Sequence, residues 1–157
     1  MWRQGQRRSA LQGPTLQATD ALQPGLPGTL SGKISSAGWR DIGGERVYFR
    51  SRWEANYARY LQFLLEQKAI SAWQHEPETF WFLSIKRGVR SYLPDFKIIE
   101  NDGSHHWVEV KGYMDPKSQT KLKRFAKYYP QEKLTVVSKD WFSRNAPKLR
   151  GFISDWE

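Results

Sequence analysis

Cysteine is absent from the 157 residues of the chain. Disulfides and thiolate metal sites are therefore excluded, and a metal held by the protein must use oxygen or imidazole ligands. Acidic residues are also few, since 16 Asp and Glu stand against 25 Lys and Arg, for a formal charge of +9. This excess of positive charge predicts an acidic partner such as nucleic acid.

Long apolar runs are missing as well, because the longest comprises only residues 80–83. A membrane helix needs about 20 apolar residues, and no apolar stretch follows the charged N-terminus as it does in a signal peptide. We therefore expect a cytoplasmic protein. A hydrophobic fraction of 39%, with 8 Trp, 7 Tyr and 8 Phe, is enough to fill the core of a single domain.

The chain divides into two parts by composition. Residues 1–45 are rich in Gln, Gly, Ser, Pro and Leu without a sustained helical or strand period, so we expect a flexible N-terminal arm. Residues 46–157 have the periodic apolar pattern of a folded domain.

Helices, strands and turns alternate in this domain. Ser51 is expected to open a helix that runs to about residue 68, and Asp115-Pro116 to open a second helix that Pro130 ends. The remaining expected elements are a strand at 47–49, an edge strand and loop at 72–83, strands at 92–100, 105–111 and 134–137, and a last helix capped by Asp140 and interrupted at Pro147. This order predicts a mixed α/β domain with a central sheet flanked by helices.

The strands at 92–100 and 105–111 surround Asn101-Asp102-Gly103, which predicts an antiparallel hairpin with a three-residue loop and a left-handed glycine. In that register Glu100 pairs with Ser104, and Asp95 lies opposite Glu109 at about 4.5–5.5 Å between Cα atoms. Lys111 shares the face of Glu109 because side chains two apart point the same way. The register therefore brings two carboxylates and an amine together.

Two facing carboxylates repel each other unless a cation lies between them. Oxygen ligands suit Mg²⁺, with Mn²⁺ as a substitute, and Mg²⁺ typically takes one or two carboxylates together with water and substrate phosphate. Lys111 could orient or deprotonate an attacking water, or neutralise charge on a phosphate. The pattern therefore predicts metal-assisted hydrolysis of phosphodiester bonds.

The segments Tyr92-Leu93-Pro94-Asp95-Phe96 and Val108-Glu109-Val110-Lys111-Gly112 resemble the two halves of the PD-(D/E)XK nuclease signature. Together with Phe49-Arg50-Ser51-Arg52-Trp53-Glu54 and residues 129–138, they are similar to phage junction-resolving endonuclease I and related small phage nucleases. The resemblance covers about residues 47–140.

The resemblance implies a restriction-endonuclease-like fold in residues 46–157 and a metal-dependent DNA endonuclease, in a bacterium or a phage-infected host cell. It implies that Asp95, Glu109, Glu54 and the Val110 carbonyl hold the metal and that Lys111 is the catalytic lysine. It also implies branched DNA, such as a four-way junction, as the substrate, and a homodimer that cuts two strands during DNA recombination.

Each of these assignments has a structural alternative. Ser51-x-x-Glu54 is also a capping box, in which Glu54 stabilises the start of its helix, although this residue lies on the core-facing ridge. Asp95 and Glu109 could form a solvent-facing pair moderated by Lys111. His105 lies about 13 Å along the strand from Glu109, too far to share its ion. Glu76 and Glu78 flank Pro77 with no fixed direction, so neither is assigned to the site.

Basic residues follow the proposed site. We expect phosphate binding by Arg50, Arg52, Lys117, Lys121, Lys123 and Arg124, with Lys86, Arg87 and Arg90 as an extension of that surface, against the alternative of a solvated helix face. The alternative functions are a nuclease acting on duplex ends, flaps or transposon termini, and a non-catalytic nucleic-acid-binding module of the same fold.

Overall fold

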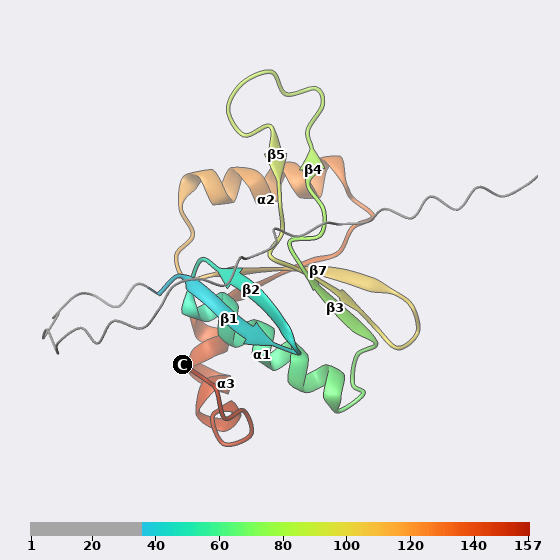
Figure 1. Cartoon of the computed structure of the whole chain (residues 1–157). Helices are drawn as coiled ribbons and strands as arrows, with labels where there is room; N and C mark the ends of the chain where they lie inside the picture. Colours follow the sequence, from blue (N-terminus) through green and yellow to red (C-terminus); the bar gives the residue numbers. More distant parts are fainter. Residues whose placement is uncertain (1–35) are drawn as a thin grey trace, which may run out of the picture. The chain divides into compact units, whose positions relative to one another are not determined.

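The computed structural model describes residues 36–157, so the expected arm lies outside the described residues up to residue 35. Figure 1 shows the elements, which are β1 (Gly38–Ile42), β2 (Glu45–Phe49), α1 (Arg52–Glu66), β3 (Ala72–His75), β4 (Phe80–Trp81), β5 (Ser91–Tyr92), β6 (Phe96–Ile99), β7 (His105–Lys111), α2 (Pro116–Tyr128), β8 (Leu134–Ser138) and α3 (Lys139–Leu149). None of the helices within residues 36–157 has the length and hydropathy of a transmembrane segment.

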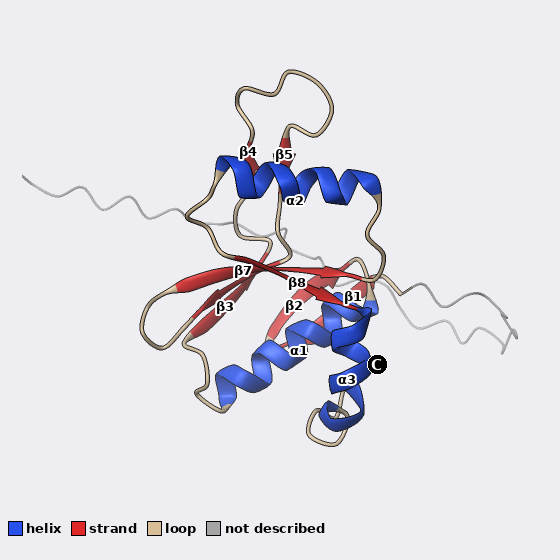
Figure 2. Cartoon of the chain, turned by 180° about the vertical axis from the view of Figure 1, so that it is seen from behind, coloured by secondary structure: helices blue, strands red, loops and turns tan. Residues whose placement is uncertain are grey.

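The main sheet has the strand order β3-β6-β7-β8. Neighbours are antiparallel from β3 to β7, whereas β8 runs parallel to β7. Figure 1 and the reverse view in Figure 2 show α1 and α3 on one face of this sheet and α2 on the other. The expected α/β class, a mixed sheet flanked by helices, is confirmed. Two further pairs of strands, β1-β2 and β4-β5, form separate hairpins.

The register of the β6–β7 hairpin agrees with the expectation. Phe96 pairs with Val108 and Ile99 with His105, and the Glu100 backbone N–H donates to the Ser104 carbonyl at 2.8 Å. Gly103 has a φ of 84°, a left-handed conformation that favours glycine and that closes the three-residue loop. One further step along the same register places the residue before Phe96 opposite Glu109.

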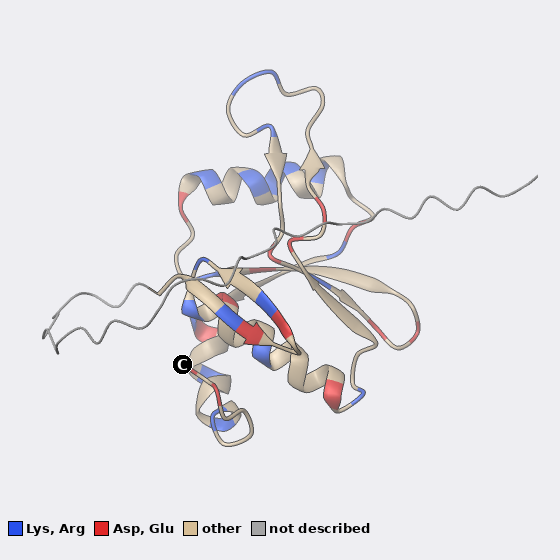
Figure 3. Ribbon diagram, viewed as in Figure 1, with Lys and Arg blue, Asp and Glu red and all other residues tan. Residues whose placement is uncertain are grey.

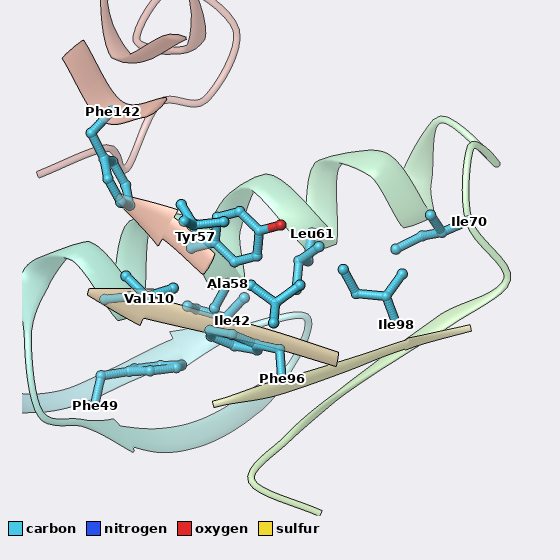
Figure 4. Packing of buried hydrophobic residues seen from close by; sticks show 13 residues of the cluster. Ile42, Phe49, Tyr57, Ala58, Leu61, Ile70, Phe96, Ile98, Val110 and Phe142 are labelled. Atoms are coloured by element: carbon cyan, nitrogen blue, oxygen red, sulfur yellow. The ribbon is translucent and has the colours of Figure 1, made fainter. Parts of the chain in front are cut away.

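One hydrophobic core lies between the sheet and α1 (Figure 4). Apolar residues three and four apart on α1, including Tyr57, Ala58 and Leu61, face Phe96 of β6 and Val110 of β7. Leu61 is fully buried, and burying a leucine side chain contributes about 1.5–3 kcal/mol. This packing fixes the sheet face opposite to the one that carries Glu109.

A second core fills the other face, under α2. Trp107 of β7 is buried there with Phe125 of α2, Tyr92 of β5, and Phe80 and Phe82 of the β4 region. The rings of Phe80 and Phe125 meet edge to face at 4.8 Å, a favourable aromatic geometry. Successive residues of β7 therefore serve opposite cores, and Glu109, two residues after Trp107, belongs to the α2 side.

Both predicted helix starts are confirmed. The Ser51 side chain accepts from the Glu54 N–H at 3.1 Å, and the Asp115 side chain accepts from the Ser118 N–H at 2.9 Å. α2 ends at Tyr128, two residues before Pro130, as expected.

The sequence-based boundaries are wrong at three places. β1 begins at Gly38, inside the expected arm. Ile42 is its one residue in the core, and Trp39 is exposed, so the strand has little apolar pattern. The expected strand at 92–100 is broken into β5 and β6 around Pro94, which has no N–H for a sheet ladder. Finally, α3 begins at Lys139, before the expected cap Asp140, and its N-cap residue Ser138 makes no side-chain hydrogen bond to the helix. The helix also passes through Pro147, since the carbonyl that loses its partner belongs to the exposed Ser143.

Glu157 joins β1 to α1 by a polar cluster. Arg40 of β1 donates to both carboxylate oxygens at 2.7 and 2.8 Å, and Arg59 of α1 donates to one of them at 2.9 Å. The Asn56 side chain exchanges hydrogen bonds with the Glu157 backbone at 2.7 and 2.9 Å. Hydrogen bonds from Arg40 are the main cause that lowers the pKa of Glu157 to about 2.

We predict that Glu157→Gln lowers the free energy of unfolding by about 1 kcal/mol at pH 7. Because the pKa of Glu157 is depressed in the folded protein, the ion pairs stabilise the fold above the ordinary value of 4.5, and this stabilisation is lost as the pH falls toward 2. Urea unfolding at pH 7 and pH 3 would measure this difference. Glu78→Gln, on an exposed residue, is the control, and a difference that does not shrink at low pH would contradict the assignment.

Candidate active site

Asp95 and Glu109 are both buried, with 4% and 7% of their surfaces exposed. Asp95 directly precedes β6 and Glu109 lies in β7, so the continued hairpin register sets them across from each other. The alternative of a solvent-facing pair is therefore wrong. Burial of two neighbouring carboxylates is unfavourable unless each is hydrogen-bonded and offset by positive charge.

Each buried carboxylate has one oxygen fixed by a protein donor. Asp95 Oδ2 accepts from the Val110 backbone N–H at 2.7 Å, and Glu109 Oε2 accepts from the Tyr92 hydroxyl at 2.9 Å. The other oxygen of each meets a cation at longer range: Asp95 Oδ1 lies 3.4 Å from Arg50 Nη2, and Glu109 Oε1 lies 3.7 Å from Lys111 Nζ. Among residues 36–157, the partner of the second oxygen of each carboxylate is therefore a basic side chain.

Burial dominates the electrostatics of the pair. Burial, and then repulsion by Glu109, raise the pKa of Asp95 to about 8. Burial also raises the pKa of Glu109, although the Tyr92 hydrogen bond and the charges of Lys111 and Lys121 oppose the rise. A divalent cation placed between the two groups would remove this penalty.

Arg50 lies at the centre of the acidic groups. Its Nη2 contacts Glu76 Oε1 and lies within ion-pair distance of Asp95. Glu76, Glu54, Asp95 and Glu109 all raise the pKa of Arg50, in opposition to its burial. Its side chain is still 59% exposed, so the guanidinium can also be reached from solvent. Arg50 therefore interacts with several carboxylates at once, while Lys111 pairs with Glu109.

Glu76 is a site residue that the sequence did not identify. It follows β3, whose His75 pairs with Phe96, and its backbone N–H donates to the Asp95 carbonyl at 2.9 Å. Its φ of 46° is left-handed, which directs the chain away from the sheet at this point. The position of Glu76 follows from the pairing of β3 with β6. The sequence of an edge strand does not indicate which strand it pairs with, so this position could not be predicted.

Glu54 has the contacts expected of a capping residue, which was the structural alternative to a metal ligand. Its Oε1 accepts from the Ser51 hydroxyl at 3.1 Å and its Oε2 accepts from the Arg50 N–H at 3.0 Å. Both oxygens therefore stabilise the start of α1 in the manner of a capping box. Glu54 remains close enough to raise the pKa values of Asp95 and Arg50.

The expected DNA-binding residues lie on α2 and around the start of α1. Lys121 is half-buried on α2 and acts on the Glu109 carboxylate, while Lys117 and Lys123 are exposed on the same helix. Figure 3 shows the basic residues spread along α2. Arg124 instead donates to the Val89 carbonyl, and exposed Arg52 lines a pocket with Trp53 at the start of α1.

The histidines are not part of the site. His105 and His106 form pairs with Glu132 at 3.0 Å and Glu100 at 3.2 Å near the hairpin loop, as the sequence indicated. His75 is enclosed by the rings of Phe49 and Phe96, and its buried Nε2 has no partner among the described residues.

The donor set fits a hard cation that takes few protein ligands. No group of three or more Asp, Glu or His side chains within residues 36–157 is arranged to hold a metal ion. Asp95 and Glu109 nevertheless supply the one or two carboxylates that Mg²⁺ typically takes, with water and phosphate in the other positions. Val110, whose carbonyl the resemblance implies as a further metal ligand, donates its N–H to Asp95 and has its side chain in the first core.

A family model described as "Protein of unknown function (DUF1064)" matches residues 39–144. The chain belongs to the DUF1064 family. The matched segment contains the whole main sheet and Glu54, Asp95, Glu109 and Lys111. No curated protein and no solved structure matches the chain.

We predict that Asp95→Asn stabilises the protein in EDTA at pH 8. The folded parent holds a proton on Asp95 at pH values where the unfolded chain has lost it, so its stability falls as the pH rises from 3.8 to about 8. Each unit of the raised pKa corresponds to about 1.4 kcal/mol at most, and asparagine keeps the acceptor for Val110 without the charge.

Thermal unfolding between pH 5 and pH 9 would test this, with Asp155→Asn, on an exposed residue, as the control. If the difference in stability between the parent and Asp95→Asn in EDTA is the same at pH 5 and pH 8, the pKa of Asp95 is not raised in the folded protein.

Proposed function

We propose that this DUF1064 protein is a metal-dependent endonuclease that hydrolyses phosphodiester bonds in DNA. The observation that carries the proposal is the burial of Asp95 and Glu109 next to each other, with one oxygen of each at ion-pair distance from a basic side chain. Burial raises the pKa of both carboxylates although Arg50 and Lys111 lie near them, and a bound divalent cation would offset this penalty.

The architecture is consistent with the proposal. A mixed sheet with helices on both faces is what the resemblance to PD-(D/E)XK nucleases implies, and we infer a restriction-endonuclease-like fold from it. The motif residues sit in this sheet at the start of β6 and in β7.

The site residues have distinct chemical tasks in this proposal. Asp95 and Glu109 would hold Mg²⁺ or Mn²⁺, which when bound supplies a Lewis acid and lowers the pKa of water at the reacting phosphate. Tyr92 fixes the orientation of Glu109 through its hydroxyl. Lys111, 3.7 Å from Glu109, orients the attacking water or neutralises charge that develops on the phosphate.

Arg50 has a second task when a cation is bound. With a divalent cation held by Asp95 and Glu109, Arg50 would no longer be needed to balance the charge of Asp95. The guanidinium, which is 59% exposed and still paired with Glu76, would then be available to a DNA phosphate.

The positive charge is consistent with an acidic partner, and the resemblance to nucleases implies that this partner is DNA. The chain has a net charge of +9, and Lys117, Lys121 and Lys123 lie on α2, the helix that covers the site side of the sheet. We extend the proposal to branched DNA and a homodimer, which the resemblance to junction-resolving nucleases implies.

We predict that the protein cuts DNA in Mg²⁺ and not in EDTA, and that Glu109→Gln and Lys111→Ala each reduce the rate by about 10²-fold or more. The assay compares a four-way junction, a flap, a linear duplex and a single strand. DNA binding is measured in parallel, because both variants should keep it.

Glu78→Gln is the matched control, since it removes the same charge from an exposed residue between β3 and β4. A Glu109→Gln variant that binds and cuts as fast as the parent would overturn the proposed mechanism. Binding by the parent without cleavage under any metal condition would instead indicate the non-catalytic module.

A further inference from the structure

A projecting hairpin next to the site carries positive charge only. It comprises β4, β5 and the connecting residues 82–90, and we call it the β4–β5 arm. Figure 1 shows the arm extending beyond α2. Residues 80–92 contain no acidic residue, and exposed cations occur at Lys86, Arg87 and Arg90. Such a segment is complementary to a polyanion.

The arm is held in place by α2. The Tyr129 hydroxyl, just after α2, donates to the Trp81 carbonyl at 2.7 Å, and the Tyr128 and Ser84 hydroxyls are hydrogen-bonded at 2.7 Å. Arg124 donates to the Val89 carbonyl. Phe82 is buried in the second core. These contacts give the arm a defined direction, so its exposed side chains form a fixed surface.

Two large apolar side chains on the arm are left exposed. Phe80 and Phe82 are buried in the second core, whereas Trp81 of β4 and Leu83, in the turn after it, lie outside this core. Trp81 is 55% exposed and Leu83 is 92% exposed. Exposed apolar groups beside cations are the combination that proteins place against unstacked bases and the phosphates next to them.

The arm is physically joined to the proposed active site. Tyr92 of β5, at the base of the arm, donates a hydrogen bond from its hydroxyl to the Glu109 carboxylate. On the α2 side, Lys121 acts on the Glu109 carboxylate, and Arg124, one turn further along, holds the arm. DNA bound along the arm would therefore lead to the same carboxylate.

We propose that the β4–β5 arm is a DNA-binding element that recognises a branch point, with Lys86, Arg87 and Arg90 on the phosphates and Trp81 and Leu83 on bases exposed at the branch. The proposal rests on the proposed nuclease function and adds the feature that selects its substrate. Bases in a continuous duplex are stacked and hide their faces, whereas a junction or a flap presents them.

The first test measures the binding of phosphates by the arm. Binding of a four-way junction is followed at several salt concentrations in the Glu109→Gln background, which prevents cleavage. The triple variant K86A/R87A/R90A is expected to bind about ten- to a hundred-fold more weakly, with a salt slope reduced by about one for each phosphate that the arm no longer neutralises. The matched control is K139A/R144A/K148A, which removes the same charge from exposed residues of α3, on the other face of the sheet.

The second test measures the stacking of bases on the arm. The variant W81S/L83S is expected to lose about tenfold in affinity for the junction and the flap, with little change for linear duplex. Phe152→Ser, which removes an apolar side chain that is 72% exposed away from the arm, is the control. Thermal unfolding of each variant confirms that the fold is retained, as expected for exposed side chains.

The outcomes separate the two proposals. If the parent cuts junctions and the arm variants bind them as tightly as the α3 control does, the proposed role of the arm is wrong and the nuclease proposal stands. If the parent never cuts DNA and the arm variants lose junction binding, the proposed role of the arm is supported and the nuclease proposal is wrong. Equal losses for junction and duplex in W81S/L83S overturn branch recognition, and binding of the parent to anionic vesicles in place of DNA overturns the arm as a DNA element.

Discussion

The structure depends on one electrostatic conflict, the burial of Asp95 and Glu109 beside each other. Hydrogen bonds from the Val110 N–H and the Tyr92 hydroxyl hold one oxygen of each group, and Arg50 and Lys111 offset part of the charge. The pKa of Asp95 nevertheless rises to about 8, so the balance is incomplete. A protein that retains such a pair in its interior gives up stability, and a bound cation is the physical means that would recover it.

The rest of the fold positions this pair. The Gly103 loop fixes the β6–β7 register, and the two hydrophobic cores fix which face of β7 each side chain takes. The turn from β2 into α1 brings Arg50 and Glu54 close to Asp95. The second core holds α2 and the β4–β5 arm, so the surfaces that would meet DNA are built on the same layer as Glu109.

The sequence predicted the parts that local signals determine and missed those that tertiary pairing determines. Gly103 and Asp115-Pro116 specify a turn and a helix start by their own backbone chemistry, and both are confirmed. The partner of Asp95 followed from register alone. Glu76 and the central place of Arg50 depend on how β3 and β2 approach β6, for which neighbouring residues give no signal. β1 was missed because a single buried residue, Ile42, joins it to the core.

The most direct test of the buried pair as a cation site is a crystal structure of the protein with Mn²⁺, in which anomalous scattering locates the ion. We expect an ion at about 2.0–2.5 Å from a carboxylate oxygen of both Asp95 and Glu109. Mn²⁺ bound only elsewhere, with Arg50 still against Asp95 at saturating metal, would contradict the assignment of this pair as a cation site.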